Sequence, residues 1–291
     1  MKIAIVGLLH HPIAEPFAGG MESHTWWLAK KLIERGHEVT LFASGDSDPT
    51  LVLSPCIEQS FAATPKAQTM LGCQACNMTA YASVIRQICQ GSFEVIHNNA
   101  LHPFLLLSAA ELPIPMLTVL HTPVCDELAV AVKYTSARNT LGRLAAVSVS
   151  QSLAEEWAPF SPSTIVYNGI EVASWPFSSA QPAGGALWYG RIVPDKAPHL
   201  AIQAALSAGY EIEIAGPIAD QDYFETAMQP LLEDSRVHYL GHLSHDDIKA
   251  ALLRSRVFVN TPVWKDPYGF VYAEALASGT PVASFRSGAA N

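Results

Sequence analysis

The sequence has 291 residues, a length that predicts two domains, each large enough to bury its own core. Hydrophobic residues make up 49% of the chain and charged residues only 15%, a composition that excludes a disordered protein. Seventeen basic against 26 acidic residues give a net charge of −9, the wrong sign for a broad nucleic-acid or anionic-membrane surface. An anionic ligand would therefore need local cations, and no nucleic-acid partner is expected.

The apolar stretches of the sequence lack the pattern of a membrane or export segment. Residues 101–120 are the most apolar, but Pro113 and Pro115 interrupt them, so they cannot form a spanning helix of about 20 apolar residues. Residues 1–9 have no small-residue cleavage site after them and fit a buried first strand better than a signal peptide. We therefore expect a cytoplasmic protein without a transmembrane segment, whose five cysteines are reduced and mostly buried.

Short β-rich runs alternate with helical patterns along the first half of the chain. The strands are expected at residues 2–7, 38–43, 94–97, 116–120, 145–149 and 164–167. A helix from about Met21 to Arg35 separates the first two runs, and Gly36 follows its last turn. This alternation is typical of parallel βαβ units.

The alternation stops at residues 175–185, which are rich in Pro, Gly and Ser, and then resumes. Further strands are expected at 186–189, 211–215, 237–240, 257–260 and 281–284, with helices at about 198–208, 223–233, 245–254 and 269–278. We therefore predict an α/β protein with two doubly wound, Rossmann-like domains, residues 1–174 and 186–291, joined by a linker at 175–185. Parallel sheets bind ligands at the carboxyl ends of their strands, so functional residues are expected in the strand-to-helix loops.

Two cations share the loop after the predicted strand at residues 186–189. Arg191 follows the strand almost directly, and Lys196 stands just before the next helix. Two cations at a helix N-terminus suit a diphosphate, because charge-assisted hydrogen bonds add to those of the free amides. The alternative is a pair of ordinary surface cations.

A second group of candidate residues lies between 264 and 282, which begin as a loop and end as a helix before Gly279. Gly269 at the helix entry permits close approach of a ligand to the backbone, and Glu274 stands more than a turn further along. A carboxylate at this position suits the hydroxyls of a sugar or a ribose. Taken alone, Glu274 would be a solvated helix residue and Asp266 a turn former.

Other cysteine and histidine patterns are weaker signals. Cys73 and Cys76 have the spacing of a redox or metal pair, but no second pair exists, so buried thiols are expected. The three histidines within residues 238–245 straddle a strand end and a turn, which favours surface histidines over a metal site. His97 ends a strand, and the sequence allows two roles for it, a structural histidine or a contact to the acceptor substrate. No Gly-x-Gly-x-x-Gly loop follows a strand, which argues against a dinucleotide oxidoreductase.

Five segments, in order along the chain, resemble the family 4 retaining glycosyltransferases, the glycosyl transferases of group 1. Residues 266–282 resemble the family's Glu-Pro-Phe-Gly…Glu signature, whose two carboxylates are separated by seven residues. The other four are residues 19–39 (N-terminal glycine loop and helix), 118–122 (strand ending in an active-site histidine), 166–171 (Asn-Gly-Ile-Asp segment) and 189–196 (donor-phosphate loop). Each motif alone is weak evidence for the resemblance, but the five motifs in the family's order are strong evidence.

The resemblance implies the GT-B fold, in which two Rossmann-like domains face a cleft and the second holds most of a nucleotide-sugar. It implies that Arg191 and Lys196 bind the donor diphosphate and that Glu274 binds the ribose hydroxyls. It also implies a set of contacts to the transferred sugar and the β-phosphate, made by Asp266 and by the backbone of Gly269, Phe270 and Val271.

In the first domain, the resemblance implies that His121 lines the transferred sugar and that Gly20 approaches the phosphates or the acceptor. The main catalytic work would be to stabilise the charge that develops on the leaving diphosphate, without a dedicated nucleophile or a metal ion. The mechanism suggested for such enzymes is a same-face transfer in which the leaving phosphate takes the proton of the acceptor.

Two features depart from the family pattern. Asp266 stands where the family has Glu, which shortens the reach of the carboxylate by about 1.5 Å. The family also continues beyond Pro281 and Val282 with further βα units and a C-terminal helix. We therefore expect the chain to be a fragment of a longer polypeptide, or to cover the missing layer with a partner subunit or by self-association.

The expected function is that of a retaining, metal-independent glycosyltransferase that uses a nucleotide-diphosphate-sugar, with a UDP-sugar as the first candidate donor and an unidentified acceptor. No cofactor is expected apart from this donor substrate. The alternative is a catalytically silent relative that binds a nucleotide-sugar or a partner. A sugar-nucleotide 2-epimerase is disfavoured, because the five segments are those of the transferases.

Overall fold

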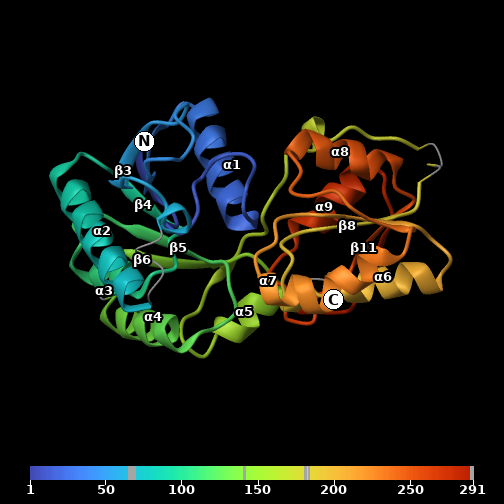
Figure 1. Cartoon of the computed structure of the whole chain (residues 1–291). Helices are drawn as coiled ribbons and strands as arrows, with labels where there is room; N and C mark the ends of the chain where they lie inside the picture. Colours follow the sequence, from blue (N-terminus) through green and yellow to red (C-terminus); the bar gives the residue numbers. More distant parts are fainter. Residues whose placement is uncertain (65–69, 140–141, 180–181, 183, 289–291) are drawn as a thin grey trace. The chain divides into compact units, whose positions relative to one another are not determined.

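The computed structural model describes residues 1–64, 70–139, 142–179, 182 and 184–288. By its internal contacts the chain divides into two compact units, Met1–Tyr167 and Asn168–Asn291. Each unit contains one parallel sheet, and helical segments connect most of its successive strands (Figure 1). This organisation confirms the predicted α/β fold.

The sheet of the first unit has seven parallel strands in the order β3-β2-β1-β4-β5-β6-β7. They are β1 (Lys2–Val6), β2 (Glu38–Ser44), β3 (Leu53–Ile57), β4 (Val95–Asn98), β5 (Met116–Leu120), β6 (Leu144–Ser148) and β7 (Thr164–Ile165). β1 lies between β2 and β4, with Ile5 paired to Leu41 on one side and to His97 on the other. The strand order reverses between β1 and β4, so their carboxyl ends form a topological switch point.

Helices cover both faces of this sheet. They are α1 (Gly20–Glu34), α2 (Met70–Gln90), α3 (Pro103–Ser108), α4 (Asp126–Arg138) and α5 (Gln151–Trp157), with short 3-10 turns η1 (Phe61–Ala63) and η3 (Ala109–Glu111). Ile3 and Ile5 of β1 pack with α1, whereas Ala4 and Val6 pack with α2 on the opposite face. Because both faces are buried, β1 is apolar from Ile3 to Val6 instead of alternating. Among the described residues of both units, no helix is long and apolar enough to cross a membrane.

The sequence pattern did not predict the edge strand β3. It contains Pro55, which cannot donate a ladder hydrogen bond and is tolerated because β3 pairs with β2 alone. At the other edge, β7 is shorter than the strand predicted at 164–167. Val166 still donates to the carbonyl oxygen of Ser148, but Val166 and Tyr167 are exposed, at 54% and 63%.

The sheet of the second unit has five parallel strands in the order β10-β9-β8-β11-β12. They are β8 (Ala186–Tyr189), β9 (Ile212–Ala215), β10 (Val237–Tyr239), β11 (Val257–Asn260) and β12 (Val282–Ser284). The order reverses between β8 and β11, which places the switch point of this sheet at their carboxyl ends.

The helices of the second unit again cover both faces of its sheet. They are α6 (Pro198–Ser207), α7 (Gln221–Tyr223), α8 (His245–Arg254) and α9 (Phe270–Ala277). On β8, Trp188 packs with α6 on one face, and Leu187 packs with α8 and α9 on the other. The single helix predicted at 223–233 is wrong in form, because α7 continues as a π-helix, η6 (Phe224–Met228), and a 3-10 turn, η7 (Gln229–Glu233). Pro230 lacks the amide hydrogen that a regular α-helix requires there.

The segment predicted as a linker begins inside the second unit. Trp175 is 5% exposed and packs in one core with Leu187 and Phe258, and its ring meets that of His245 edge to face at 4.8 Å. The preceding 3-10 turn, η4 (Val172–Ser174), therefore falls in the second unit, although it was expected to end the first domain. The predicted domain limits themselves stay predictions.

The expectation that the cysteines are mostly buried is wrong. Cys76, Cys89 and Cys125 are exposed and Cys56 is half-buried, all as free thiols. Burial raises the pKa of the Cys56 thiol to about 12, so it is unreactive at neutral pH. Cys76 lies on α2, and the side chain of Cys73 lies outside the described residues.

Two glycines let the loops after β8 and β9 approach each other closely. Gly216 has a φ of +140°, and a Cβ atom on it would lie 1.8 Å from the carbonyl oxygen of Gly190. Gly190 in turn opens the loop that carries Arg191. The absence of a side chain at Gly216 therefore sets the path of the loop with the two candidate cations.

We predict that Gly216→Ala lowers the free energy of unfolding by at least about 3 kcal/mol, because it combines an unfavourable φ with a clash against backbone. Gly241→Ala is the matched control, since Gly241 also has a positive φ (+75°) but open space around its Cβ position. It should cost about 1–2 kcal/mol. Urea unfolding of both variants measures the difference, and equal losses would show that the close approach does not matter.

Candidate functional site

The candidate site of the second unit begins at the carboxyl end of β8. Arg191 follows Gly190 and is exposed, and the 3-10 turn η5 (Pro194–Lys196) ends at the half-buried Lys196. Ala197 then adopts a left-handed conformation with a φ of +45° and caps α6. This turn places Lys196 at the N-terminus of α6, where the helix-end amides favour anions.

An ion pair connects this loop to the loop after β11. The Lys196 ammonium donates to Asp266 at 2.9 Å between Nζ and Oδ2, and the side chains are 22% and 5% exposed. Lys196 Nζ also lies 5.2 Å from the centre of the Trp264 ring. β8 and β11 are neighbours in the sheet, so the pair lies at the switch point. The sequence suggested separate roles for Lys196 and Asp266 and did not reveal their contact.

The start of α9 completes the same end of the sheet. Gly269 caps the helix with a φ of +76°, and a Cβ atom on it would lie 2.3 Å from Cε2 of Tyr272. Phe270 and Val271 follow directly and form the first turn of α9. Tyr268 donates through its hydroxyl to the carbonyl oxygen of Asn168, which ties the Asn-Gly-Ile segment to this loop.

Glu274, one turn into α9, is held by the last residue of β8. The hydroxyl of Tyr189 donates to Oε2 of Glu274 at 2.6 Å. Desolvation raises the pKa of Glu274 to about 7, although the hydrogen bond from Tyr189 acts in the opposite direction. Burial, with the nearby Glu274, also holds the pKa of Tyr189 well above its usual value, so the hydroxyl stays a donor. Sequence reasoning missed Tyr189, whose only signal was its place directly before Gly190 and Arg191.

The first unit carries a second group of candidate residues near its own switch point. Gly20 is exposed and is the first residue of α1. His121 follows β5 directly and is 6% exposed. Its Nε2 lies 3.1 Å from Oδ1 of Asn99, a fully buried residue just after β4, and its ring meets that of His24 edge to face at 4.8 Å.

Three imidazoles are close enough in this unit to affect one another. Burial lowers the pKa values of His24 and His97 to about 4 and that of His121 well below its usual value. A positive charge on either neighbour would lower the pKa of His121 further. The three rings are therefore neutral at pH 7. Within the described ranges, no group of three or more His, Cys, Asp or Glu side chains is placed to hold a metal ion.

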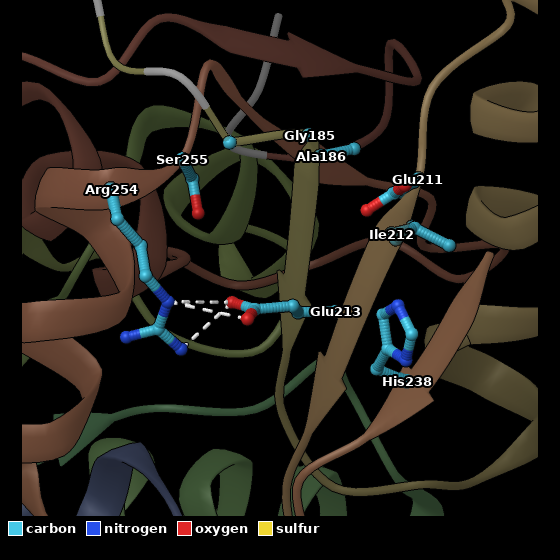
Figure 2. Close-up of a pocket in the computed structure, with 9 residues that line it drawn as sticks. Gly185, Ala186, Glu211, Ile212, Glu213, His238, Arg254 and Ser255 are labelled. Carbon is cyan, nitrogen blue, oxygen red and sulfur yellow. Dashed lines mark hydrogen bonds and ion pairs between the residues drawn. The ribbon is translucent and has the colours of Figure 1, made fainter.

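A separate pocket of about 100 Å³ lies at the opposite, amino-terminal end of the second sheet (Figure 2). It is lined by residues at the starts of β8, β9 and β10 and by the end of α8, namely Gly184, Gly185, Ala186, Glu211, Ile212, Glu213, His238, Arg254 and Ser255. Figure 2 shows the guanidinium of Arg254 facing the carboxylate of Glu213, to which it donates at 2.8 Å. None of the residues predicted for donor binding lines this pocket.

Two family descriptions match most of the chain. Glycosyltransferase Family 4 matches residues 18–174, and Glycosyl transferases group 1 matches residues 182–291. The two matched ranges contain all the segments in which the predicted site residues lie.

Two relatives illustrate the similarity at the level of sequence. The chain is 31% identical over 157 residues to a glycogen synthase of Mycobacterium tuberculosis, in an alignment that covers 48% of this chain and 36% of that protein. It is 28% identical to a phosphatidyl-myo-inositol mannosyltransferase of Mycolicibacterium smegmatis, in an alignment that covers 93% of this chain and 73% of that protein.

Solved structures with the same fold include HepE of Anabaena in complex with UDP-glucose, with a TM-score of 0.74 and 17% identity over all of this chain and 82% of that one. Another is sucrose-phosphate synthase of Thermosynechococcus elongatus, with a TM-score of 0.76 and 16% identity over 99% of this chain and 82% of that one. These neighbours confirm the predicted GT-B fold. The chain therefore belongs to glycosyltransferase family 4, with a second half of the glycosyl transferases group 1 type.

Proposed function

We propose that the protein is a retaining, metal-independent glycosyltransferase that moves a sugar from a nucleotide-diphosphate-sugar to an acceptor. The observation that carries the proposal is the ion pair between Lys196 and Asp266, which joins cation and carboxylate at the switch point of the second sheet. The cation can bind the negatively charged diphosphate of a donor, and the carboxylate can accept hydrogen bonds from sugar hydroxyls. HepE, which shares the fold, was solved with UDP-glucose, which supports a UDP-sugar as the first donor to test.

The cations of the β8 loop would bind the diphosphate of the donor. Lys196 is mostly shielded from water, so its charge acts more strongly on a nearby phosphate than that of an exposed lysine would. Arg191 is exposed on the same loop and has the planar fork that suits phosphate oxygens. As the bond to the sugar breaks, both cations would stabilise the charge that develops on the leaving phosphate, which a metal ion does in other enzymes.

Asp266 would exchange its partner when the donor binds. A diphosphate next to Lys196 competes with the carboxylate for the same ammonium hydrogens, and Asp266 is then available to accept hydrogen bonds from hydroxyls of the transferred sugar. The loop amides of Phe270 and Val271 would add contacts to the β-phosphate. In a same-face transfer, a phosphate oxygen of the leaving group takes the proton of the acceptor, so no protein side chain has to act as the base.

Glu274 would hold the ribose through its carboxylate. Tyr189 already orients one oxygen of this carboxylate, and the other oxygen is available to a ribose hydroxyl. Only the ionised form accepts from two hydroxyls and from Tyr189 together, so donor binding and ionisation of Glu274 should be coupled.

The activity itself is tested by incubating the protein with UDP-glucose, GDP-mannose and ADP-glucose and measuring release of the nucleoside diphosphate. We predict that Arg191→Ala and Lys196→Ala each lower kcat/KM for the accepted donor at least tenfold, or about 1.4 kcal/mol. Arg236→Ala, which removes a cation paired with Asp234 at the surface, is the control and should have no effect. Binding without release would support the catalytically silent alternative, and unchanged kinetics in both site variants would refute their proposed role.

A second prediction concerns the competition between Asp266 and phosphate. Asp266→Asn should bind free UDP several-fold more tightly than the unmodified protein, because Lys196 loses its anionic partner, and should release less product from UDP-glucose. Asp195→Asn is the control for loss of one negative charge, since Asp195 is exposed on the same loop and precedes Lys196. Titration calorimetry with UDP compares the three proteins. Weaker or unchanged UDP binding in Asp266→Asn alone would contradict the competition.

A third prediction follows from the pKa of about 7 at Glu274. At pH 6 only about a tenth of this carboxyl is ionised, and at pH 8 about nine tenths, so affinity for UDP-glucose should rise up to about tenfold between the two. UDP-glucose is the suitable probe, because its diphosphate has no ionisable terminal phosphate that titrates near pH 6. Glu274→Gln should bind more weakly and show no such rise. Titration calorimetry at both pH values measures this, and the same pH dependence in Glu274→Gln would assign the effect to another group.

A further inference from the structure

A chain of buried hydrogen bonds in the first unit starts inside α1. Thr25 is 2% exposed, and its hydroxyl donates to the carbonyl oxygen of Met21, one turn earlier, at 2.8 Å. A hydroxyl has a single hydrogen, so toward any other neighbour Thr25 Oγ1 can only accept. The direction of every later bond in the chain depends on this one.

The next bond orients the side-chain amide of Asn99. Its Nδ2 lies 3.1 Å from Thr25 Oγ1, and because Thr25 has no further hydrogen, Nδ2 donates there. Oδ1 of Asn99 consequently points to Nε2 of His121, 3.1 Å away.

An amide oxygen can only accept, so His121 must donate to it from Nε2. We propose that Thr25 and Asn99 are positioning residues that hold His121 as the neutral Nε2–H tautomer, with the lone pair on Nδ1 available to accept a hydrogen bond from a sugar hydroxyl. The sugar contact rests on the proposed function; the tautomer does not. Asn99 is fully buried and His121 is 6% exposed, so water is a poor substitute for the missing partner if one bond is broken.

The arrangement restricts what His121 can do. Its Nε2 proton is bound to Asn99, and its ring is neutral because burial and the neighbouring His24 and His97 oppose a positive charge. His121 therefore offers the transferred sugar a hydrogen-bond acceptor, the Nδ1 lone pair, and no acidic proton. Thr25 lies little more than a turn beyond Gly20, so the same bonds tie the start of α1 to the end of β5.

The tautomer can be measured directly on the protein without donor. Histidine labelled with ¹⁵N, observed in long-range ¹H–¹⁵N spectra at pH 7, distinguishes a protonated Nε2 from a protonated Nδ1, and the His121→Gln variant assigns the signals. We expect His121 to be neutral and protonated at Nε2. A ring protonated mainly at Nδ1, or at both nitrogens, would overturn the proposal.

Two substitutions at residue 25 test the chain of hydrogen bonds from Thr25 through Asn99 to His121. Thr25→Val keeps the shape of the side chain but removes the hydroxyl, so Asn99 is free to turn over, and the ratio of Nε2–H to Nδ1–H forms should fall roughly fivefold or more. Thr25→Ser keeps the hydroxyl and should leave the ratio within about twofold. An unchanged ratio of the two His121 tautomers in folded Thr25→Val would contradict the proposed role of Thr25.

If Thr25→Val does not fold, Asn99→Asp provides the second test. Its carboxylate still accepts from Nε2, and its negative charge should raise the pKa of His121 by at least one unit in an NMR titration, about 1.4 kcal/mol. No change in that pKa would show that residue 99 does not contact His121.

Addition of UDP-glucose to the labelled, unmodified protein tests the sugar contact and should shift the Nδ1 signal of His121. A bound donor without this shift would overturn the sugar contact, whereas failure of the donor to bind would count against the proposed function and leave the tautomer result intact.

Discussion

A parallel sheet that is covered by helices on both faces leaves only the ends of its strands for polar chemistry. In the first unit Ile3 to Val6 of β1 are buried on both sides, and in the second unit Trp188 and Leu187 of β8 are buried on opposite faces. The candidate site residues of both units lie beyond the carboxyl ends of strands, in the loops and helices that follow them. The switch points β1/β4 and β8/β11 are where such ends diverge and leave room for a ligand.

At these strand ends, three candidate site residues are partnered within the protein before a ligand arrives. Lys196 is paired with Asp266, Glu274 with Tyr189, and His121 with Asn99. Each partnership reduces the cost of a partly buried polar group and also orients it. The proposed donor would then compete with or extend existing contacts instead of creating a site from mobile side chains. The raised pKa of Glu274 shows that such partners offset the desolvation of a carboxylate only in part.

Local sequence features were sufficient to predict most of the fold. Apolar runs and glycines predicted eleven of the twelve strands of the described residues closely enough to place Arg191 and Lys196 in a strand-to-helix loop, whereas β3, which contains Pro55, was missed. The partnerships could not be predicted, because Lys196 and Asp266 are 70 residues apart, Tyr189 and Glu274 are 85 apart, and Thr25 and Asn99 are 74 apart. Periodicity within a segment carries no information on which distant side chains the sheet brings together.

In the proposed function, a nucleotide-sugar binds at the carboxyl ends of β8 and β11. Hydrogen–deuterium exchange with and without UDP-glucose, or with whichever donor the activity screen selects, tests it without any substitution. We predict slower exchange in residues 190–197 and 264–272 when the donor is present, because their backbone and side chains would contact the diphosphate and the sugar. Protection confined to Gly185, Glu211 and Arg254, at the opposite end of the same sheet, would contradict the claim.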